Sequence, residues 1–201
     1  MRRRKSTGTR AKGQMSRVLQ FAVVSLLFAL CSSSSAEIID RVLAILPGQI
    51  ITQTDVQAAL DLGLVEAPEG SDRIGIGLSA VIDRVLMLNE VRRVIPAEPS
   101  ATAVDARVAR IRQRFESPAA LAHVLAARGI DEAILRIYAA DDLRLASYLE
   151  ERFSAASQPT DEEVRQAGDG SRQRLADERR RTLVGAWTSE LRRRADVTVL
   201  Q

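Results

Sequence analysis

A short glycine motif is the first pattern in the sequence that could hold a cofactor. Gly75, Gly77 and Ala80 have the G-x-G-x-x-A spacing of a dinucleotide-binding fingerprint. That chemistry requires the glycines to follow a buried strand, so that the pyrophosphate meets a helix N-terminus. Here Gly75 lies near the end of a polar stretch, residues 65–76, and Gly77 directly follows that stretch. No parallel-sheet pattern surrounds them. We therefore interpret them as the end of a loop and the start of a helix, and we expect no cofactor.

The single histidine, His123, has the right chemistry for a metal ligand or a catalytic base. A metal site would need carboxylates beside it, and a serine nucleophile would need a histidine that an acid orients. His123 instead lies in the segment AALAHVLAARG, next to an apolar helix face and without such partners. The sequence therefore predicts a surface or half-buried histidine, no metal site and no catalytic role.

Three runs of acidic residues offer paired carboxylates for acid–base catalysis. They are Asp141-Asp142, Glu150-Glu151 and Asp161-Glu162-Glu163. Neighbouring residues on a helix point about 100° apart, so such pairs do not converge on one substrate atom. Arginines accompany each run, which is typical of a solvated helix face with ion pairs. We expect exposed ion pairs at these positions and no catalytic residues.

Two arginine triplets, Arg179-Arg180-Arg181 and Arg192-Arg193-Arg194, have the charge to bind phosphate groups. No aromatic residues are interleaved with the arginines, as they would be on a surface that stacks single-stranded nucleic acid. Acidic residues, among them Glu178 and Glu190, accompany the triplets. We expect structural or solubility roles for them, with an anionic membrane surface as the alternative partner. Nucleic acid is not an expected partner.

The basic net charge belongs to the first part of the chain. The 201 residues carry a formal net charge of +3, but residues 1–36 contain seven basic residues and no acid. Residues 37–201 have 22 arginines against 26 acidic residues, a net charge of −4. A composition of 46% hydrophobic and 27% charged residues is that of an ordinary folded protein. The 3% of aromatic residues predicts an aliphatic core.

Residues 1–36 have the three zones of a secretory signal peptide. A basic stretch precedes an apolar run at 18–30, and small polar residues follow as far as Ala36. The apolar run is shorter than the roughly 20 residues that a membrane-spanning helix needs. We predict cleavage between Ala36 and Glu37, and hence a periplasmic protein without a membrane span.

Two other fates of this leader are less favoured, namely an uncleaved membrane anchor and a lipoprotein acylated at Cys31. Lipoprotein processing requires a small residue before the cysteine, where the sequence has Leu30. Translation from Met15 would also give a compact signal peptide. Because Cys31 is the only cysteine, its removal with the leader would exclude disulfides and thiolate chemistry.

The remaining sequence has helical patterning, with short apolar strands at its two ends. Strands are expected on both sides of the Pro47-Gly48 turn and again at 196–200. Cap residues and apolar spacing predict helices over about 54–62, from 78 to before Pro96, from 100 to 115, over 118–129, from 131 to about 149, and from 175 onward. The predicted fold class is mainly α, with a small sheet that the N-terminal strands and the C-terminal strand form together.

The order of these elements carries a family resemblance. The relevant segments are IIDRVLAILPGQIITQTDVQAAL with Asp40, AVIDRVLMLNEVRRV, AEPSATAVDARVARI, SQPTDEEVRQ, and the tail RRTLVGAWTSELRRRADVTVL with Trp187 and Leu191. In this order, after a signal peptide, they resemble the SurA-type periplasmic chaperones. The resemblance implies a helical N-terminal domain at 37–155, a linker at 156–174, and a C-terminal helix and strand at 175–201 that complete one core module.

The resemblance departs from the family at the linker. Family members carry a parvulin isomerase domain of about a hundred residues there, whereas this chain has about a dozen. An isomerase pocket of that type contains several histidines, and this chain has one. The resemblance therefore implies no prolyl isomerase activity and no enzyme.

What the resemblance does imply is an ATP-independent chaperone, a holdase, for unfolded outer-membrane or other envelope proteins. The alternative is a non-catalytic adaptor or structural subunit that docks one folded envelope partner, such as a separate isomerase. Residue spacing does not separate groove-lining from core side chains, so no client-binding residues are assigned at this point.

Overall fold

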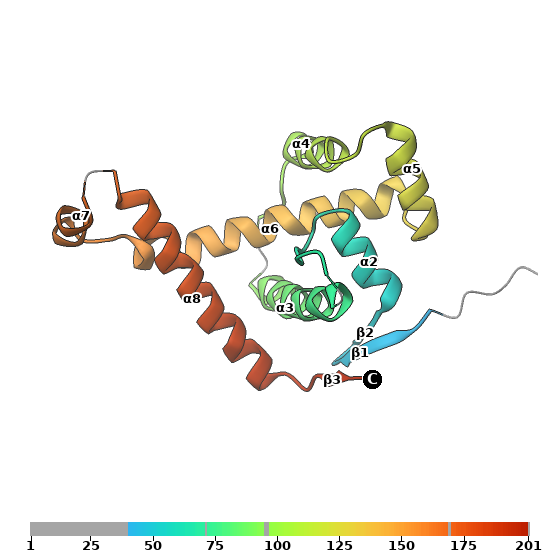
Figure 1. The fold of residues 1–201 in the computed structure, drawn as a ribbon, viewed down its shortest axis with the longest axis horizontal. Coiled ribbons are helices and arrows are strands. Elements are labelled where there is room, and N and C mark those ends of the chain that lie inside the picture. The colour runs from blue at the N-terminus through green and yellow to red at the C-terminus, as the bar shows by residue number, and fades with distance from the viewer. Residues whose placement is uncertain (1–39, 71, 95–96, 169, 201) are drawn as a thin grey trace, which may run out of the picture. The chain divides into compact units, whose positions relative to one another are not determined.

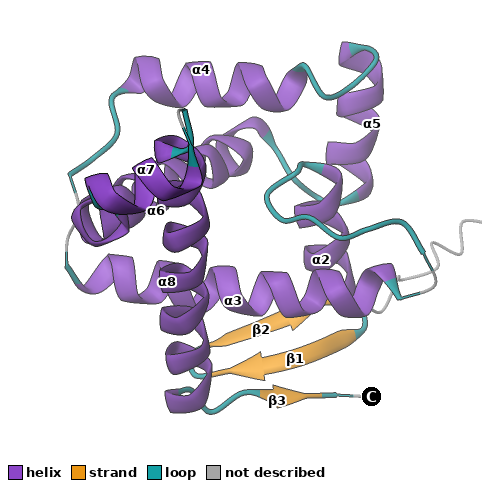
Figure 2. Ribbon diagram, turned by 60° about the vertical axis from the view of Figure 1, so that its left-hand side comes forward, coloured by secondary structure: helices purple, strands orange, loops and turns teal. Residues whose placement is uncertain are grey.

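The computed structural model describes residues 40–200 except residues 71, 95–96 and 169, and the two ends of this stretch meet in one sheet. β1 (Val42–Leu46) and β2 (Gln49–Thr52) form an antiparallel hairpin. β3 (Thr198–Val199) pairs antiparallel with the other side of β1, so the strand order is β2-β1-β3 (Figure 2). This confirms the predicted small sheet from both ends. The predicted cleavage point, Ala36 and Glu37, lies outside the described residues.

The hairpin register follows from its turn and from its apolar alternation. Gly48 has φ of +77°, a left-handed conformation that glycine adopts without strain. Leu46 pairs with Gln49 across this two-residue turn, and Ala44 pairs with Ile51. Ala44 and Ile51 are 0% and 1% exposed, so this face of the hairpin lies on the core.

Seven helices account for most of the described residues, which confirms the mainly α prediction (Figure 1). The helices are α2 (Gln53–Asp61), α3 (Arg73–Arg93), α4 (Ala101–Arg112), α5 (Pro118–Ala127), α6 (Glu132–Ser157), α7 (Asp161–Ala167) and α8 (Arg172–Arg194). None of these described helices has the length and apolar character needed to cross a bilayer.

Asp40 ties the start of the hairpin to the start of α2. Its Oδ1 accepts a hydrogen bond of 3.1 Å from the backbone N–H of Thr54, and the Gln53 N–H donates to the Arg41 carbonyl at 2.8 Å. Burial acts to raise the pKa of Asp40, but hydrogen bonds from Thr52 and Thr54 outweigh it and lower the pKa. Ionised Asp40 therefore stabilises the fold at neutral pH, and this stabilisation is lost as the pH falls through the lowered pKa.

Two segments differ from the sequence expectation. α3 begins at Arg73, inside the expected loop at 65–76, so Gly75 and Gly77 are helical. α7 lies inside the expected linker at 156–174, where Thr160 and Glu163 form a reciprocal capping box. The polar composition of these two stretches concealed only the start of α3, whose remainder was predicted from its apolar spacing, and the whole of α7.

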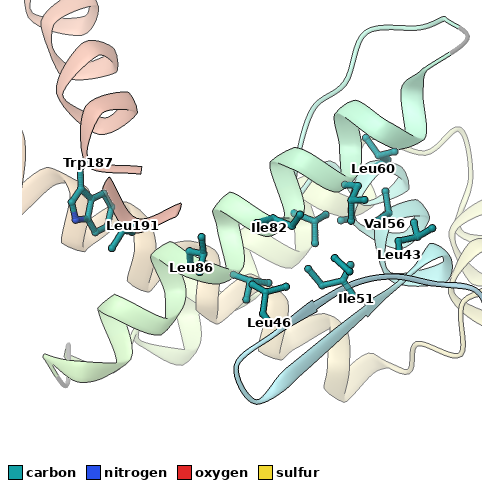
Figure 3. Packing of buried hydrophobic residues seen from close by; sticks show 14 of the residues in the cluster. Leu43, Leu46, Ile51, Val56, Leu60, Ile82, Leu86, Trp187 and Leu191 are labelled. Atoms are coloured by element: carbon teal, nitrogen blue, oxygen red, sulfur yellow. The ribbon is translucent and has the colours of Figure 1, made fainter. Parts of the chain in front are cut away.

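Two large apolar clusters form the core. The first lies between the sheet, α2, α3 and α8, and Figure 3 shows Leu46 and Ile51 of the hairpin close to α3. The second lies between the end of α2, α4, α5 and α6, with Ile111 and Leu135 fully buried. α2 contributes to both clusters, so it joins the sheet side of the protein to the α4–α5 side.

Gly77 is needed where α2 and α3 cross. A Cβ atom at this position would lie 2.8 Å from Leu60 Cδ1 and 3.0 Å from Val56 Cγ1, inside the first core cluster. We expect Gly77→Val to lower the free energy of unfolding by about 1–3 kcal/mol through overpacking. Gly185, in the middle of α8, has open space at the same position, so Gly185→Ala should raise it by about 0.5–1 kcal/mol. Urea unfolding measures both, and a stabilising Gly77→Val variant would contradict the packing argument.

Candidate binding cleft

A cleft with a volume of about 210 Å³ opens between β2, α2, α3 and α6. Its floor is apolar and consists of buried side chains from α2 and α3, of which all but Leu88 belong to the two large core clusters. The floor residues are Ala58, Ala59, Val81, Val85 and Leu88. The small alanines on α2 leave the hollow that larger side chains would fill, so the helix faces that build the core also create the cleft.

The rim of the cleft is charged. Asp55 of α2 and Arg92 of α3 are exposed there, whereas Arg84 of α3 and Asp141 of α6 also line the cleft but are largely shielded from water. Tyr138, also on α6, adds a half-buried phenol. An apolar floor with a polar rim is the usual composition of a surface that binds part of another molecule.

Tyr138 keeps its proton at neutral pH. Burial, and then the negative charge of Asp55, raise the pKa of its hydroxyl, while Arg84 acts in the opposite direction. The hydroxyl can therefore donate a hydrogen bond to a molecule in the cleft.

A strand edge forms one wall of the cleft. β2 pairs with β1 on one side, and among the described residues no strand pairs with its other side. Ile50 pairs with Ile45, and both side chains are exposed on the outer face of the sheet, at 56% and 44%. Ile50 also lines the cleft, together with its neighbours Gln49 and Ile51.

On the α3–α6 side of the cleft, two arginines share one carboxylate that is largely shielded from water, that of Asp142. Arg84 Nη1 lies 2.5 Å from Asp142 Oδ1, and Arg107 Nη2 lies 2.5 Å from Asp142 Oδ2. The side chains of Arg84 and Asp142 are each 12% exposed, and that of Arg107 is 23% exposed. These contacts fasten α3 and α4 to α6, which sets the spacing between the α3 and α6 walls of the cleft.

Asp141 holds a second pair of arginines. Its carboxylate lies 3.1 Å from Arg92 Nη2 and 2.9 Å from Arg144 Nη1, and the residue is 8% exposed. The expectation of a solvated face at Asp141-Asp142 was therefore wrong. The two carboxylates are shielded where α3 and α4 pack on α6, and arginines compensate their burial.

The other sequence candidates lie apart from the cleft lining. His123 is exposed on α5, as expected. Glu150 pairs with Arg180, and Glu163 of α7 pairs with Arg179 of α8. Among the residues that the structure describes, no group of three or more His, Cys, Asp or Glu side chains is placed to hold a metal ion.

The arginine triplets of α8 are engaged within the protein. Arg192 bonds to Asp83 and to the Ser79 carbonyl of α3, the latter at 2.6 Å. Arg193 and Arg194 both contact Glu190. These ion pairs are the structural role that the sequence predicts for this triplet.

The cleft itself was not found from the sequence. Its floor residues have ordinary helical core spacing, and its edge strand has ordinary alternation. The hollow exists only because α2, α3, α6 and β2 meet at one place. Small residues at Ala58 and Ala59, next to each other on a buried helix, are the one signal that points to it.

Comparison with known proteins adds no relative. The sequence matches no protein-family model, and no curated protein matches it. The resemblance to SurA-type chaperones therefore rests on the sequence motifs and remains a prediction.

Proposed function

We propose that the chain, after removal of residues 1–36, is a periplasmic ATP-independent chaperone that holds unfolded outer-membrane or other envelope proteins. The observation that carries the proposal is the open cleft, with its apolar floor, its charged rim and an edge of β2 with which no described strand pairs. An unfolded chain presents both apolar side chains and unpaired backbone groups, and this cleft offers a partner for each. The signal-peptide pattern and the order of the SurA-like motifs support the same proposal from the sequence.

The dimensions of the cleft suit segments and not whole ligands. A volume of about 210 Å³ is smaller than that of most sites for drug-sized molecules or cofactors. It suits one or a few side chains of an extended chain. Such limited burial gives weak binding, which lets a client leave without energy from ATP.

The direct test follows aggregation. Protein starting at Glu37 is mixed with a urea-unfolded outer-membrane barrel protein, the urea is diluted, and light scattering is recorded. Suppression at near-stoichiometric ratios is the expected result. No suppression by a folded protein, together with one stoichiometric folded partner on co-purification, would replace the chaperone with the adaptor.

A matched pair of leucines tests whether the cleft does the holding. Leu64 packs against both core clusters and Leu125 against the second only, and of the two only Leu64 lines the cleft. We expect each of Leu64→Gln and Leu125→Gln to lower the free energy of unfolding by about 1–2 kcal/mol, Leu64→Gln by the larger amount, so holding is compared at a temperature where both variants are folded. Only Leu64→Gln should raise the chaperone concentration needed for half-suppression of scattering, by roughly threefold or more. Equal loss of holding in both variants would show that stability, and not the cleft, limits the assay.

A further inference from the structure

The open edge of β2 defines how a client would bind, and this inference rests on the proposed function. In an antiparallel hairpin with a two-residue turn, the residues next to the turn exchange hydrogen bonds, and the following pair does not. Leu46 and Gln49 flank the turn, so Ile45 and Ile50 are the following pair. The N–H and C=O of Ile50 therefore point away from β1, toward the cleft.

An unpaired strand edge specifies the chemistry of its partner. A row of free backbone groups binds another extended backbone, and side-chain pockets beside the edge then add selectivity. Here the apolar floor lies directly beside the edge, since Ile50, Ile51 and Val85 line one hollow. The expected occupant is an extended segment that pairs with β2 and places an apolar side chain on this floor.

The charges of the rim give this segment a direction. Asp55 accepts hydrogen bonds from Thr52, at the C-terminal end of β2. Arg92 lines both the cleft and the neighbouring hollow beside Pro47, at the turn end of β2. A segment antiparallel to β2 would begin near Asp55 and end near Arg92. A basic residue at its start and an acidic residue at its end complement these charges.

We propose that β2 captures clients by strand addition: an extended, unfolded segment pairs antiparallel with the backbone of Ile50 and inserts an apolar side chain between α2 and α3. The sheet then has four strands in the order client-β2-β1-β3. Recognition through the backbone accepts many sequences, whereas the charged rim and the small floor select among them.

The test uses a labelled peptide, Lys-Thr-Val-Thr-Phe-Thr-Val-Glu, and fluorescence anisotropy with protein starting at Glu37. Two further peptides have the same sequence but carry N-methyl groups on alternate residues, one peptide for each edge. Strand addition predicts that methylation of one edge weakens binding roughly tenfold, while methylation of the other edge has little effect. Equal affinities for all three peptides would overturn the inference.

The protein side of the test replaces the backbone donor at Ile50. Ile50→Pro removes the N–H that faces the cleft and leaves the β1–β2 bonds in place, whereas Ile50→Val keeps the N–H and a similar size. We expect peptide binding to be roughly tenfold weaker for Ile50→Pro than for Ile50→Val, because only the valine variant keeps the N–H. If Ile50→Pro fails to fold by circular dichroism, slower hydrogen exchange at the Ile50 amide of the unaltered protein on peptide addition takes its place.

The outcomes separate this inference from the proposed function. Suppressed aggregation that is insensitive to Ile50→Pro would overturn strand addition and leave the chaperone intact. If the protein neither suppressed aggregation nor bound the peptide, both strand addition and the proposed chaperone function would be overturned. A dimer in sedimentation that Ile50→Pro dissociates would assign the edge to a second copy of the chain, and would also overturn the inference.

Discussion

Replacing Asp142 by alanine is expected to lower the free energy of unfolding by about 3–5 kcal/mol. The substitution leaves Arg84 and Arg107 without their shared carboxylate at the junction of α3, α4 and α6. Both guanidinium groups are largely shielded from water, so their charges would remain buried and uncompensated. Urea unfolding, followed by the fluorescence of Trp187, measures the loss.

Asp105 provides the control for this prediction. It pairs with Arg136 between the same two helices, α4 and α6, but its side chain is 62% exposed. Asp105→Ala should cost no more than about 1 kcal/mol, because water replaces the lost partner. If the two aspartate variants were equally stable, burial would not be what makes the Asp142 contacts important.

The second large effect is expected at Trp187, the only tryptophan of the chain. It is 9% exposed where α8 crosses α6, with its ring 5.7 Å from Tyr148 and 5.8 Å from Phe153 between centroids. Trp187→Ala leaves a cavity in the first core cluster, and we expect a loss of about 3–5 kcal/mol. Circular dichroism must follow this unfolding, since the fluorophore is removed.

Two milder variants distinguish the cost of leaving a cavity at Trp187 from the cost of losing the positive charge beside its ring. The Arg152 guanidinium carbon lies 5.4 Å from the Trp187 ring centroid. Arg152→Ala should cost about 0.5–1 kcal/mol if it loses only a surface cation–π contact. The loss in free energy of unfolding for Trp187→Phe should lie between the losses for Arg152→Ala and Trp187→Ala. If Arg152→Ala lowered the free energy of unfolding more than Trp187→Ala does, packing would not be the main contribution of Trp187 to stability.

The parts of the fold that were predicted from sequence are those that local chemistry determines. Asp131 caps α6 by accepting the Ile134 N–H at 2.8 Å, as an acid before an apolar run predicts. α5 ends at Ala127 and is followed by Gly129 with φ of +63°, and the Ile130 N–H bonds to the Leu125 carbonyl. These contacts lie within a few residues of each other, so a single sequence contains the information for them.

The parts that were missed depend on contacts between distant segments. The polar composition of residues 65–76 predicts a loop up to the glycines, but α3 already begins at Arg73, and Gly77 packs against Leu60 of α2. Asp142 was assigned to a solvated face because arginines accompany it in sequence, yet its partners Arg84 and Arg107 come from other helices.

One feature of the sequence does indicate that the Asp142 side chain is shielded from water. Leu135, Ala139 and Leu145 are buried on α6, and Asp142 lies at helical spacing on the same stripe. A charged residue on an apolar stripe indicates a buried carboxylate that needs cationic partners. For the cleft, the sequence offered only the adjacent small residues Ala58 and Ala59, because the hollow depends on how four elements meet.

The position of β1 between β2 and β3 has a consequence for the order in which the protein folds. Ala44 and Val199 pair although they lie about 155 positions apart along the chain. A newly made chain can form its hairpin and the second core cluster early, but the first core cluster needs α8, and β1 stays open on one side until β3 has been made. Closure of the sheet is therefore the final step, and the slow search for such a distant partner sets its rate. A chain shortened by its last few residues would keep its helices and never complete that step.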